Sequence, residues 1–291
     1  MPRQALDNQG PEFYLMFMEN RADRPQNFSL EVYITTRVQT GRVDIRMSAD
    51  KWLSNIHGLD GGPVPPFQMA EALAPIYPDI TYVDFQEVRK FNISRMLRQI
   101  GTGKDYKGIY VQARNDVIVY GFNKDTYTND GFMGLPLDVL GTTYYAVVYW
   151  PPVPSSLYTE IGVVATADNT IVKFTFPGEQ RGAHSYDPLR RVDIRYNGRM
   201  YSNGDTLVVT LDRLDTFQVQ SVGDLTGTLI KSTKPVAAFS GNVRTWVGME
   251  IWAEKEKSRD HLVEQLFPVE KWGKTFVTVP TPARTVGDFY M

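Results

Sequence analysis

The sequence predicts an all-β protein with two tandem antiparallel β-sandwich repeats, jelly-roll-like or Greek-key, of about 130 residues each, and the start of a third. Three observations predict this fold. Short apolar runs bounded by Gly, Pro and Ser are typical of strands. Residues 105–123 recur as residues 224–242 without a gap, so that Asp105 aligns with Asp224. A second motif, a Gly followed three residues later by an aromatic residue, begins at residues 10, 141 and 273.

These spacings set the expected domain boundaries. We expect one repeat over residues 10–140, a second over residues 141–272 and the truncated start of a third over residues 273–291. Each whole repeat is long enough to bury a core, so residues 141–272 are expected to fold alone. Because the third repeat is barely begun and residues 1–7 lack the apolar core of a signal peptide, we expect the chain to be a fragment of a longer protein.

Individual strands follow from alternation of apolar and polar residues. In the first repeat, residues 13–18 form an apolar aromatic run, and residues 30–34 and 43–47 alternate as strands with one solvated face do. The second repeat has strands in the same slots and further ones around the Asn197-Gly198 turn, a strong hairpin signal. The expected strands of the second repeat are residues 144–150, 161–165, 171–176, 192–196, 200–203, 206–211 and 217–219.

The recurring block predicts two short buried strands, residues 228–230 and 236–239, joined by a polar turn over residues 231–234. The spacing between motifs also locates insertions. We expect extra residues of the first repeat in the Gly- and Pro-rich segment 58–80, with a short helix over residues 68–73, and extra residues of the second repeat after Asn242.

The composition excludes several classes of function. The 31 basic and 33 acidic residues give a net charge of -2, which argues against a nucleic-acid surface or an anionic membrane surface. No apolar run is long enough for a membrane-spanning helix. The chain contains no Cys, which excludes disulfides, zinc-thiolate sites and thiol catalysis within it.

Two sequons, Asn27-Phe28-Ser29 and Asn92-Ile93-Ser94, predict N-glycosylation at Asn27 and Asn92 in a secreted protein, although such triplets also arise by chance. Asn92 lies between two apolar residues. In a strand its side chain therefore points to the opposite face from theirs, and we expect Asn92 to face solvent.

The three histidines do not predict a metal site. On a helical turn, His261 and Glu264 would share one face and could bind a metal or share a proton. His57 and His184 lie elsewhere in the sequence, however, and two ligands do not make a zinc site. The alternative is a buried turn in which His261 is hydrogen-bonded beside Pro268. We expect no metal and no cofactor.

Acidic pairs give an equally weak indication of catalysis. Asp212 with Asp215, or Asp116 with Asp130, could act in glycoside hydrolysis if both carboxylates faced one cleft. Acidic residues are common in turns for local reasons, however. The sequence also lacks a nucleophile elbow and a phosphate-binding loop. We therefore expect no catalytic residues.

The insertion at residues 244–252 is unusually aromatic and apolar for a loop. Trp, Met and Arg are enriched in recognition surfaces, so Arg244, Trp246, Met249 and Trp252 are candidate ligand-binding residues. The alternative is that this segment packs on its own sandwich or on the neighbouring repeat.

A set of motif residues resembles the IgGFc-binding protein N-terminal domain family, and the similarity extends over nearly the whole chain. The set comprises Asp224, Gly227, Pro235, Gly241, Asn242, Asp260, His261, Glu264 and Gln265, for which structural roles are expected. The resemblance implies a secreted, multidomain animal glycoprotein of mucus or extracellular matrix, with roles in cell adhesion or innate immunity. It also implies that the module lies beside von Willebrand D-type or other adhesive domains.

The resemblance to the vertebrate pattern is incomplete. In that pattern a cysteine pair brackets the loop before the Asp-His-Leu motif, whereas residues 244–259 contain Ser258 and no Cys. This departure indicates an invertebrate-type member, and animals without immunoglobulins cannot use the module for Fc. The module and its extracellular location are therefore carried over, but the ligand is not.

These inferences favour a non-enzymatic extracellular binding or adhesion module that recognises protein or glycan through its insertion loops. The expected partners are mucin-like, matrix or microbial-surface molecules, with no nucleic acid and no membrane insertion. One alternative is a carbohydrate-active enzyme on a β-sandwich, which needs two carboxylates or the His261–Glu264 pair in a cleft. The other alternative is a purely structural spacer.

Overall fold

A computed structural model describes residues 7–20, 28–37, 43–51, 81–84, 87–149, 158–178, 191–245, 259–275 and 277. The fold is all-β, and every pair of named strands in these ranges is antiparallel, which confirms the predicted fold class. We call residues 10–140 the N-terminal half and residues 141–272 the C-terminal half. The duplication and its boundaries stay predictions.

Within the ranges described, the N-terminal half contains eight strands: β1 (Gly10–Leu15), β2 (Ser29–Thr35), β3 (Val43–Ser48), β4 (Thr81–Val83), β5 (Val88–Ile93), β6 (Gly103–Asp105), β7 (Ile109–Lys124) and β8 (Asn129–Met133). The C-terminal half contains nine: β9 (Gly141–Tyr145), β10 (Thr159–Ala165), β11 (Thr170–Thr175), β12 (Ile194–Tyr196), β13 (Arg199–Tyr201), β14 (Thr206–Leu211), β15 (Thr216–Ser221), β16 (Leu229–Thr245) and β17 (Asp260–Gln265). Two short 3-10 helices, η2 (Arg95–Leu97) and η4 (Val269–Lys271), complete the described elements.

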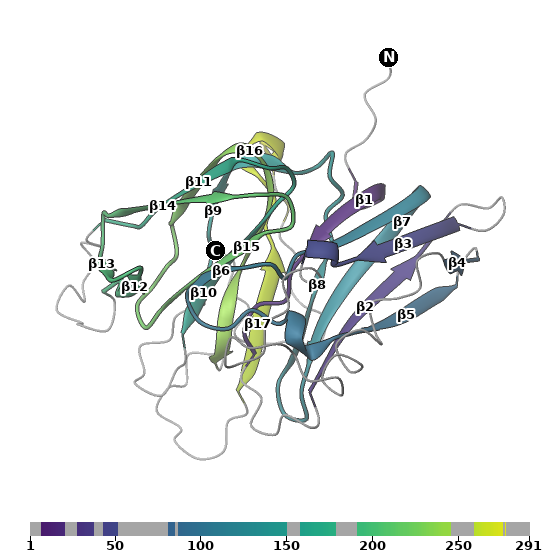
Figure 1. The fold of residues 1–291 in the computed structure, drawn as a ribbon, viewed down its shortest axis with the longest axis horizontal. Helices are drawn as coiled ribbons and strands as arrows, with labels where there is room; N and C mark the ends of the chain where they lie inside the picture. Colours follow the sequence, from purple (N-terminus) through teal and green to yellow (C-terminus); the bar gives the residue numbers. More distant parts are fainter. Residues whose placement is uncertain are drawn as a thin grey trace.

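One long strand organises each half. The first part of β7 pairs with β1 and β3, and its second part pairs with β2 and β8. In the C-terminal half, β16 pairs with β9 and β11 along its first part, and with β10 and β17 along its second part. The long strands therefore have partners in the same order along the chain (Figure 1).

The predicted polar turn at residues 231–234 is wrong, because these residues lie inside the continuous strand β16. Lys231 is paired on one side with Thr143 and on the other with Lys173. The polar side chains of this stretch are exposed or half-buried, so they face solvent, while the backbone is paired at Lys231 and Ser232. The pairing with β9 shifts register between Lys231 and Val236, a bulge of the kind that bends a strand.

The Asn197-Gly198 hairpin is confirmed. β12 and β13 pair around this turn, with Tyr196 opposite Arg199. Asn197 and Gly198 both have positive φ angles, of 48° and 73°, as a type I′ turn requires. The predicted helix over residues 68–73 lies outside the described residues.

The extra residues of the N-terminal half are not where the motif spacing placed them. The connections 49–80 and 176–205, between corresponding strands, are of similar length. The difference lies instead between β5 and β7, where residues 94–108 contain η2 and β6, while only residues 222–228 connect β15 to β16. β6 pairs with β15 of the other half, so this insertion joins the two halves.

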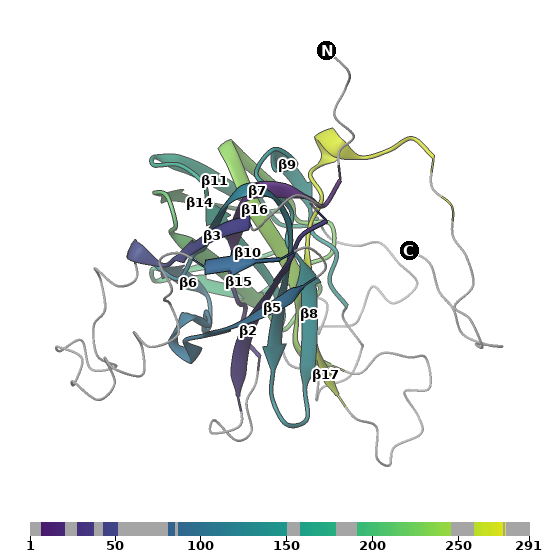
Figure 2. The ribbon, with the colours of Figure 1, turned by 90° about the vertical axis from the view of Figure 1, so that its right-hand side faces the viewer.

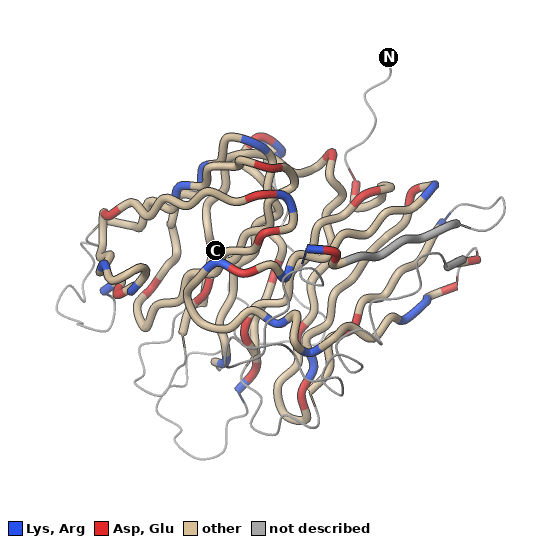
Figure 3. Tube along the Cα trace, in the orientation of Figure 1, with Lys and Arg blue, Asp and Glu red and all other residues tan. Residues whose placement is uncertain are grey.

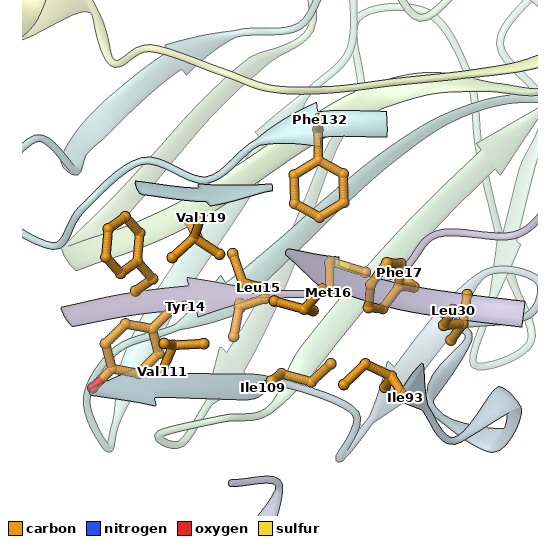
Figure 4. Close-up of a cluster of buried hydrophobic side chains, with 14 of the residues drawn as sticks. Tyr14, Leu15, Met16, Phe17, Leu30, Ile93, Ile109, Val111, Val119 and Phe132 are labelled. Atoms are coloured by element: carbon orange, nitrogen blue, oxygen red, sulfur yellow. The ribbon is translucent and has the colours of Figure 1, made fainter. Parts of the chain in front are cut away.

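The two halves share a hydrophobic core. One buried cluster centres on residues of β1, β2 and β7 and on Phe132 of β8, whose side chains converge in Figure 4. It also includes five residues of the C-terminal half: Val164, Leu214, Ala237, Phe239 and Val263. A second cluster lies within the C-terminal half. Strands β8 and β17 therefore lie side by side where the halves meet, as two perpendicular views show (Figures 1 and 2).

Candidate binding surface

The outward side of the sheet formed by β5, β2, β7 and β8 carries exposed aromatic side chains. Strand alternation buries Leu30, Val32 and Ile34 of β2 completely, so Glu31 and Tyr33 point to the other side. The same alternation brings Tyr120 to this outer side. We call the outward set the aromatic face; it comprises Glu31, Tyr33, Lys90, Asn92, Tyr120, Phe122 and Met133.

The strand register places these side chains in two rows. One row runs from Lys90 through Tyr33 and Tyr120 to Met133. The other row runs from Asn92 through Glu31 and Phe122 to Gly131.

Ring contacts hold the aromatic side chains in place. Tyr33 and Phe122 meet edge to face with their ring centroids 5.2 Å apart. Tyr120 and Phe122 remain 37% and 36% exposed. A Cβ at Gly131 would lie 2.6 Å from a ring carbon of Phe122, so glycine lets that ring lie flat on the neighbouring strand.

A nearly buried carboxylate anchors the centre of the face. Glu31 accepts hydrogen bonds from the Tyr33 hydroxyl at 2.8 Å, from Lys124 at 3.2 Å and from Lys90 at 3.3 Å. Burial alone would raise the pKa of Glu31, but these hydrogen bonds outweigh it and the pKa lies below its ordinary value. The bond to Glu31 raises the pKa of Tyr33. Glu31 is therefore a negative charge matched by two lysines, and its hydrogen bond with Tyr33 helps to position that ring.

Exposed rings beside charged and amide groups are suited to recognition. A ring can stack against the apolar face of a sugar or take an apolar side chain of a protein, while Lys90 and Asn92 offer polar contacts at the rim. Across the described residues, basic and acidic side chains are interspersed along the whole trace (Figure 3). No group of three His, Asp or Glu residues that could hold a metal ion occurs in the described ranges.

The Asp-His-Leu motif lies in a strand, which corrects the helical-turn interpretation of His261 and Glu264. In β17, His261 is fully buried and Glu264 is exposed on the opposite side, so the two side chains cannot share a proton or a metal. His261 is hydrogen-bonded, as the alternative interpretation expected, but within a paired strand rather than a turn.

His261 lies in a buried polar network between the halves. Its Nδ1 is 3.0 Å from the Asn242 carbonyl oxygen, and its Nε2 is 3.4 Å from the Asn123 amide nitrogen. Because Asn123 Nδ2 can only donate, these contacts fit the neutral tautomer with its proton on Nδ1. Burial lowers the pKa of His261 to about 4 and raises the pKa of the neighbouring Glu160 carboxyl well above its ordinary value. His261 is therefore neutral at pH 7, and burial favours the protonated, uncharged form of Glu160, which suits a structural role.

Asp130 and Asp260 bridge the edge strands β8 and β17. Asp130 Oδ2 accepts from the Val263 backbone N–H at 2.7 Å, and Asp260 Oδ1 accepts from the Asn129 N–H at 2.8 Å. Gln265 adds a third bridge, because its Oε1 accepts from the Leu135 N–H at 2.9 Å. The family-motif residues Asp260 and Gln265, together with Asp130, therefore join the two halves.

The remaining motif residues shape the backbone. Asp224 accepts from the Thr226 N–H at 2.9 Å, and Gly227 has a φ of 85° that favours glycine. The Pro235 carbonyl accepts from Thr166, and the Asn242 side chain donates to the Tyr149 carbonyl at 3.1 Å. At Gly241, a Cβ would lie 1.8 Å from the Leu262 carbonyl oxygen, so no side chain fits.

The acidic pairs do not form a hydrolytic site in the described residues. Asp215 is fully buried and makes ion pairs with Lys51 at 2.6 Å and with Lys104 at 2.7 Å, while Asp212 is half-buried and accepts from the Asn169 N–H at 2.9 Å. Asp130 bonds to β17, as described above, whereas Asp116 is an exposed residue of β7.

Several candidate residues lie outside the described ranges: Asn27, His57, His184, Trp246, Met249 and Trp252. Arg244, at the end of β16, is half-buried, and its backbone N–H donates to the Asn242 side chain. Asn92 is exposed while Phe91 and Ile93 are buried, so its expected orientation is confirmed. Asn92 also belongs to the aromatic face.

Sequence reasoning missed the aromatic face, because Tyr33 and Tyr120 are far apart in the chain and only strand register brings them together. One signal was available. Tyr120 and Phe122 alternate with apolar residues in a strand whose other side is fully buried. Strand alternation therefore predicts that both rings face outward.

Two comparisons with known proteins match this chain. The family model described as "IgGFc binding protein" matches residues 130–291, more than half of the chain. The chain belongs to the IgGFc-binding protein family. A human relative, the IgGFc-binding protein of Homo sapiens, is 31% identical over 193 residues, which cover 66% of this chain and 3% of that protein. The chain thus spans a small part of its IgGFc-binding relative, and its family is one of extracellular binding proteins. In the described part of the chain, no helix is long and apolar enough to span a membrane.

Proposed function

We propose that this chain is a non-enzymatic module of a secreted mucus- or matrix-type protein, and that it recognises a protein or a glycan. The observation that carries the proposal is the aromatic face, where Tyr33, Tyr120 and Phe122 surround a fixed carboxylate. Monomeric proteins rarely leave large ring surfaces uncovered without a binding role. The name of the human relative, which refers to IgG Fc, supports protein binding as the general class of activity.

The insertion after β16 is a second candidate surface. Arg244, Trp246, Met249 and Trp252 remain proposed contacts. Arg244 lies at the end of β16, whose partner β17 carries the Asp-His-Leu motif, and the other three residues follow β16 in the sequence. The aromatic face and this insertion lie on different elements, so separate variants can assign binding to one or the other.

The test is a screen of the secreted chain against mucins, matrix proteins and a glycan array. We expect binding that Tyr120→Ser reduces by about tenfold or more, as loss of an aromatic anchor does. Val88→Ser is the matched control, since Val88 is exposed on the neighbouring strand and lies outside the aromatic rows.

A Trp246→Ala/Trp252→Ala double variant tests the insertion in the same screen, with folding checked by circular dichroism. Binding lost only by this double variant would move the recognition site from the aromatic face to the insertion. A folded wild-type chain that binds none of these ligands would contradict the proposal and favour the structural spacer.

A further inference from the structure

The register of the two halves makes their sheet faces comparable residue by residue. β2 pairs with β7 in the same way that β10 pairs with β16. A shared hydrogen bond supports the alignment, because Asn123 donates to the Met18 carbonyl at 3.0 Å and Asn242 donates to the Tyr149 carbonyl at 3.1 Å. Four positions of the aromatic face thus correspond as follows: Glu31 to Glu160, Tyr33 to Gly162, Tyr120 to Phe239 and Phe122 to Gly241.

In the C-terminal half, this outer face is buried beneath the N-terminal half. A Cβ at Gly162 would lie 2.7 Å from the sulfur of Met16. The Phe239 ring meets the Phe132 ring edge to face, with centroids 5.1 Å apart. The covering residues therefore come from the segment that follows β1 and from β8.

The counterparts of these covering residues in the C-terminal half are themselves uncovered. Val147, which follows β9 as Met16 follows β1, is 52% exposed. Glu264 of β17 occupies the place that Phe132 has in β8, and it is exposed as well. The described residues thus form one contact between the two halves, which we call the used contact. The counterparts of its two surfaces, the aromatic face and the surface around Val147, are not covered in this way and are called the unused surfaces.

The two unused surfaces complement each other in volume and polarity. In the used contact a large side chain, Met16, lies against a position without a side chain, Gly162. In the unused pair the sizes are reversed, because Tyr33 would meet the smaller Val147. Likewise Tyr120 would meet Glu264, a carboxylate that can accept a hydrogen bond from the tyrosine hydroxyl.

We infer that the aromatic face docks a second copy of this chain through the surface around Val147 and Glu264, and repeats the contact that joins the two halves. The inference rests on the proposed function, since it names the partner of the same face. Such a contact is heterologous: each added copy presents a new aromatic face, so the assembly is an open head-to-tail array.

The contact is predicted to leave β5 uncovered. In the existing contact, residues 99–105, which include β6, cover β15: Gln99 accepts from Thr216 at 2.8 Å and β6 pairs with residues 216–218. The C-terminal half has only residues 222–228 in this place. Val88 and Asn92 of β5 would therefore stay exposed, and a glycan on Asn92 is compatible with docking.

The test is sedimentation of the purified full chain across the micromolar concentration range. We expect the average mass to rise with concentration beyond that of a dimer. Tyr120→Lys disrupts docking through the aromatic face, and Val147→Lys disrupts docking through the surface around Val147. Each variant alone is therefore expected to stay monomeric. A mixture of the two retains one intact surface of each kind and is expected to form a one-to-one dimer and nothing larger.

Val88→Lys is the control, because it adds the same charge to the same sheet outside the predicted contact; it is expected to associate as the wild type does. Circular dichroism melts check that both surface variants fold, and Tyr120→Ser repeats the test without the added charge. A wild-type chain that stays monomeric throughout, or variants that associate equally whether alone or mixed, would overturn the inference.

The outcome separates this inference from the proposed function. External ligand binding that Tyr120→Ser abolishes, in a chain that never self-associates, would leave the proposed function standing and remove the second copy as partner. Self-association with the predicted pattern, in a chain that binds no external ligand, would support the inference. It would contradict the proposed recognition of other proteins or glycans.

Discussion

At the scale of single residues, Glu160 and His261 determine how the stability of the contact between the halves depends on pH. Both are fully buried, and burial favours the uncharged form of each. The folded-state pKa of Glu160 lies above its ordinary value, so the unfolded chain releases this proton first as pH rises. Glu160 therefore reduces stability progressively as pH rises from about 4.5 through its folded-state pKa.

We predict that Glu160→Gln raises the urea midpoint of unfolding at pH 8 and changes it little at pH 4. Glutamine keeps the acceptor oxygen that Gln220 contacts at 3.0 Å and removes the ionisation. Urea titrations at both pH values measure the effect. Glu264→Gln is the control for charge removal, because Glu264 is an exposed residue of β17 on the opposite side from His261. An equal loss of stability at both pH values would mean that Glu160 is ionised in the folded protein.

The residue scale also shows what the sequence could predict. The exposure of Asn92 followed from its apolar neighbours, because strand alternation is local. The side of His261 could not be derived in that way. Side chains three positions apart lie on the same face of a helix but on opposite faces of a strand. Because the sequence analysis placed His261 and Glu264 on a helical turn instead of a strand, it put their side chains on the same side.

At the scale of elements, the length of β16 is the feature most open to test. We predict that Lys231→Pro destabilises the protein by about 2 kcal/mol or more. Lys231 has paired strands on both sides, so its N–H points into one of the two ladders and proline would remove that donor. Thermal melts followed by circular dichroism measure the change, with Lys231→Thr as the control. If Lys231→Pro is tolerated as well as Lys231→Thr, the segment is a turn.

The sequence predicted both ends of β16 and missed their continuity for a physical reason. Polar residues between apolar runs favour a turn when the chain is considered alone. Here β9 and β11 supply partners on both sides, and these hydrogen bonds keep polar residues in a strand. Tertiary pairing of this kind is not encoded in the local pattern.

At the scale of the whole molecule, the shared core leads us to expect cooperative unfolding of both halves. We predict one calorimetric transition for the full chain, and no stable monomer for residues 141–272 alone. That segment would expose Phe239, Ala237 and Val164, which the N-terminal half now covers. Calorimetry and circular dichroism of both proteins test this. A segment 141–272 that melts cooperatively at the wild-type temperature would show that each half has a sufficient core.

The recurring motifs occupy matching strands of the two halves, because the recurring block lies in β7 and in β16. They could not indicate how the halves pack, because that contact joins unlike surfaces of the two halves. Met16 and Gly162 contact each other where the halves meet, and no local sequence pattern around either residue predicts this contact.

The β6–β15 ladder has a consequence for aggregation. An unpaired outer strand is a template on which a foreign strand can add, and β15 would be such a strand without β6. The corresponding outer strand of the N-terminal half, β5, has no strand on its far side in the described sheet, but it carries Arg89, Lys90 and the sequon residue Asn92. One half thus protects its sheet edge with a strand from the other half. The other half has charged residues at its edge, and a glycan on the sequon, if attached, would add to that protection.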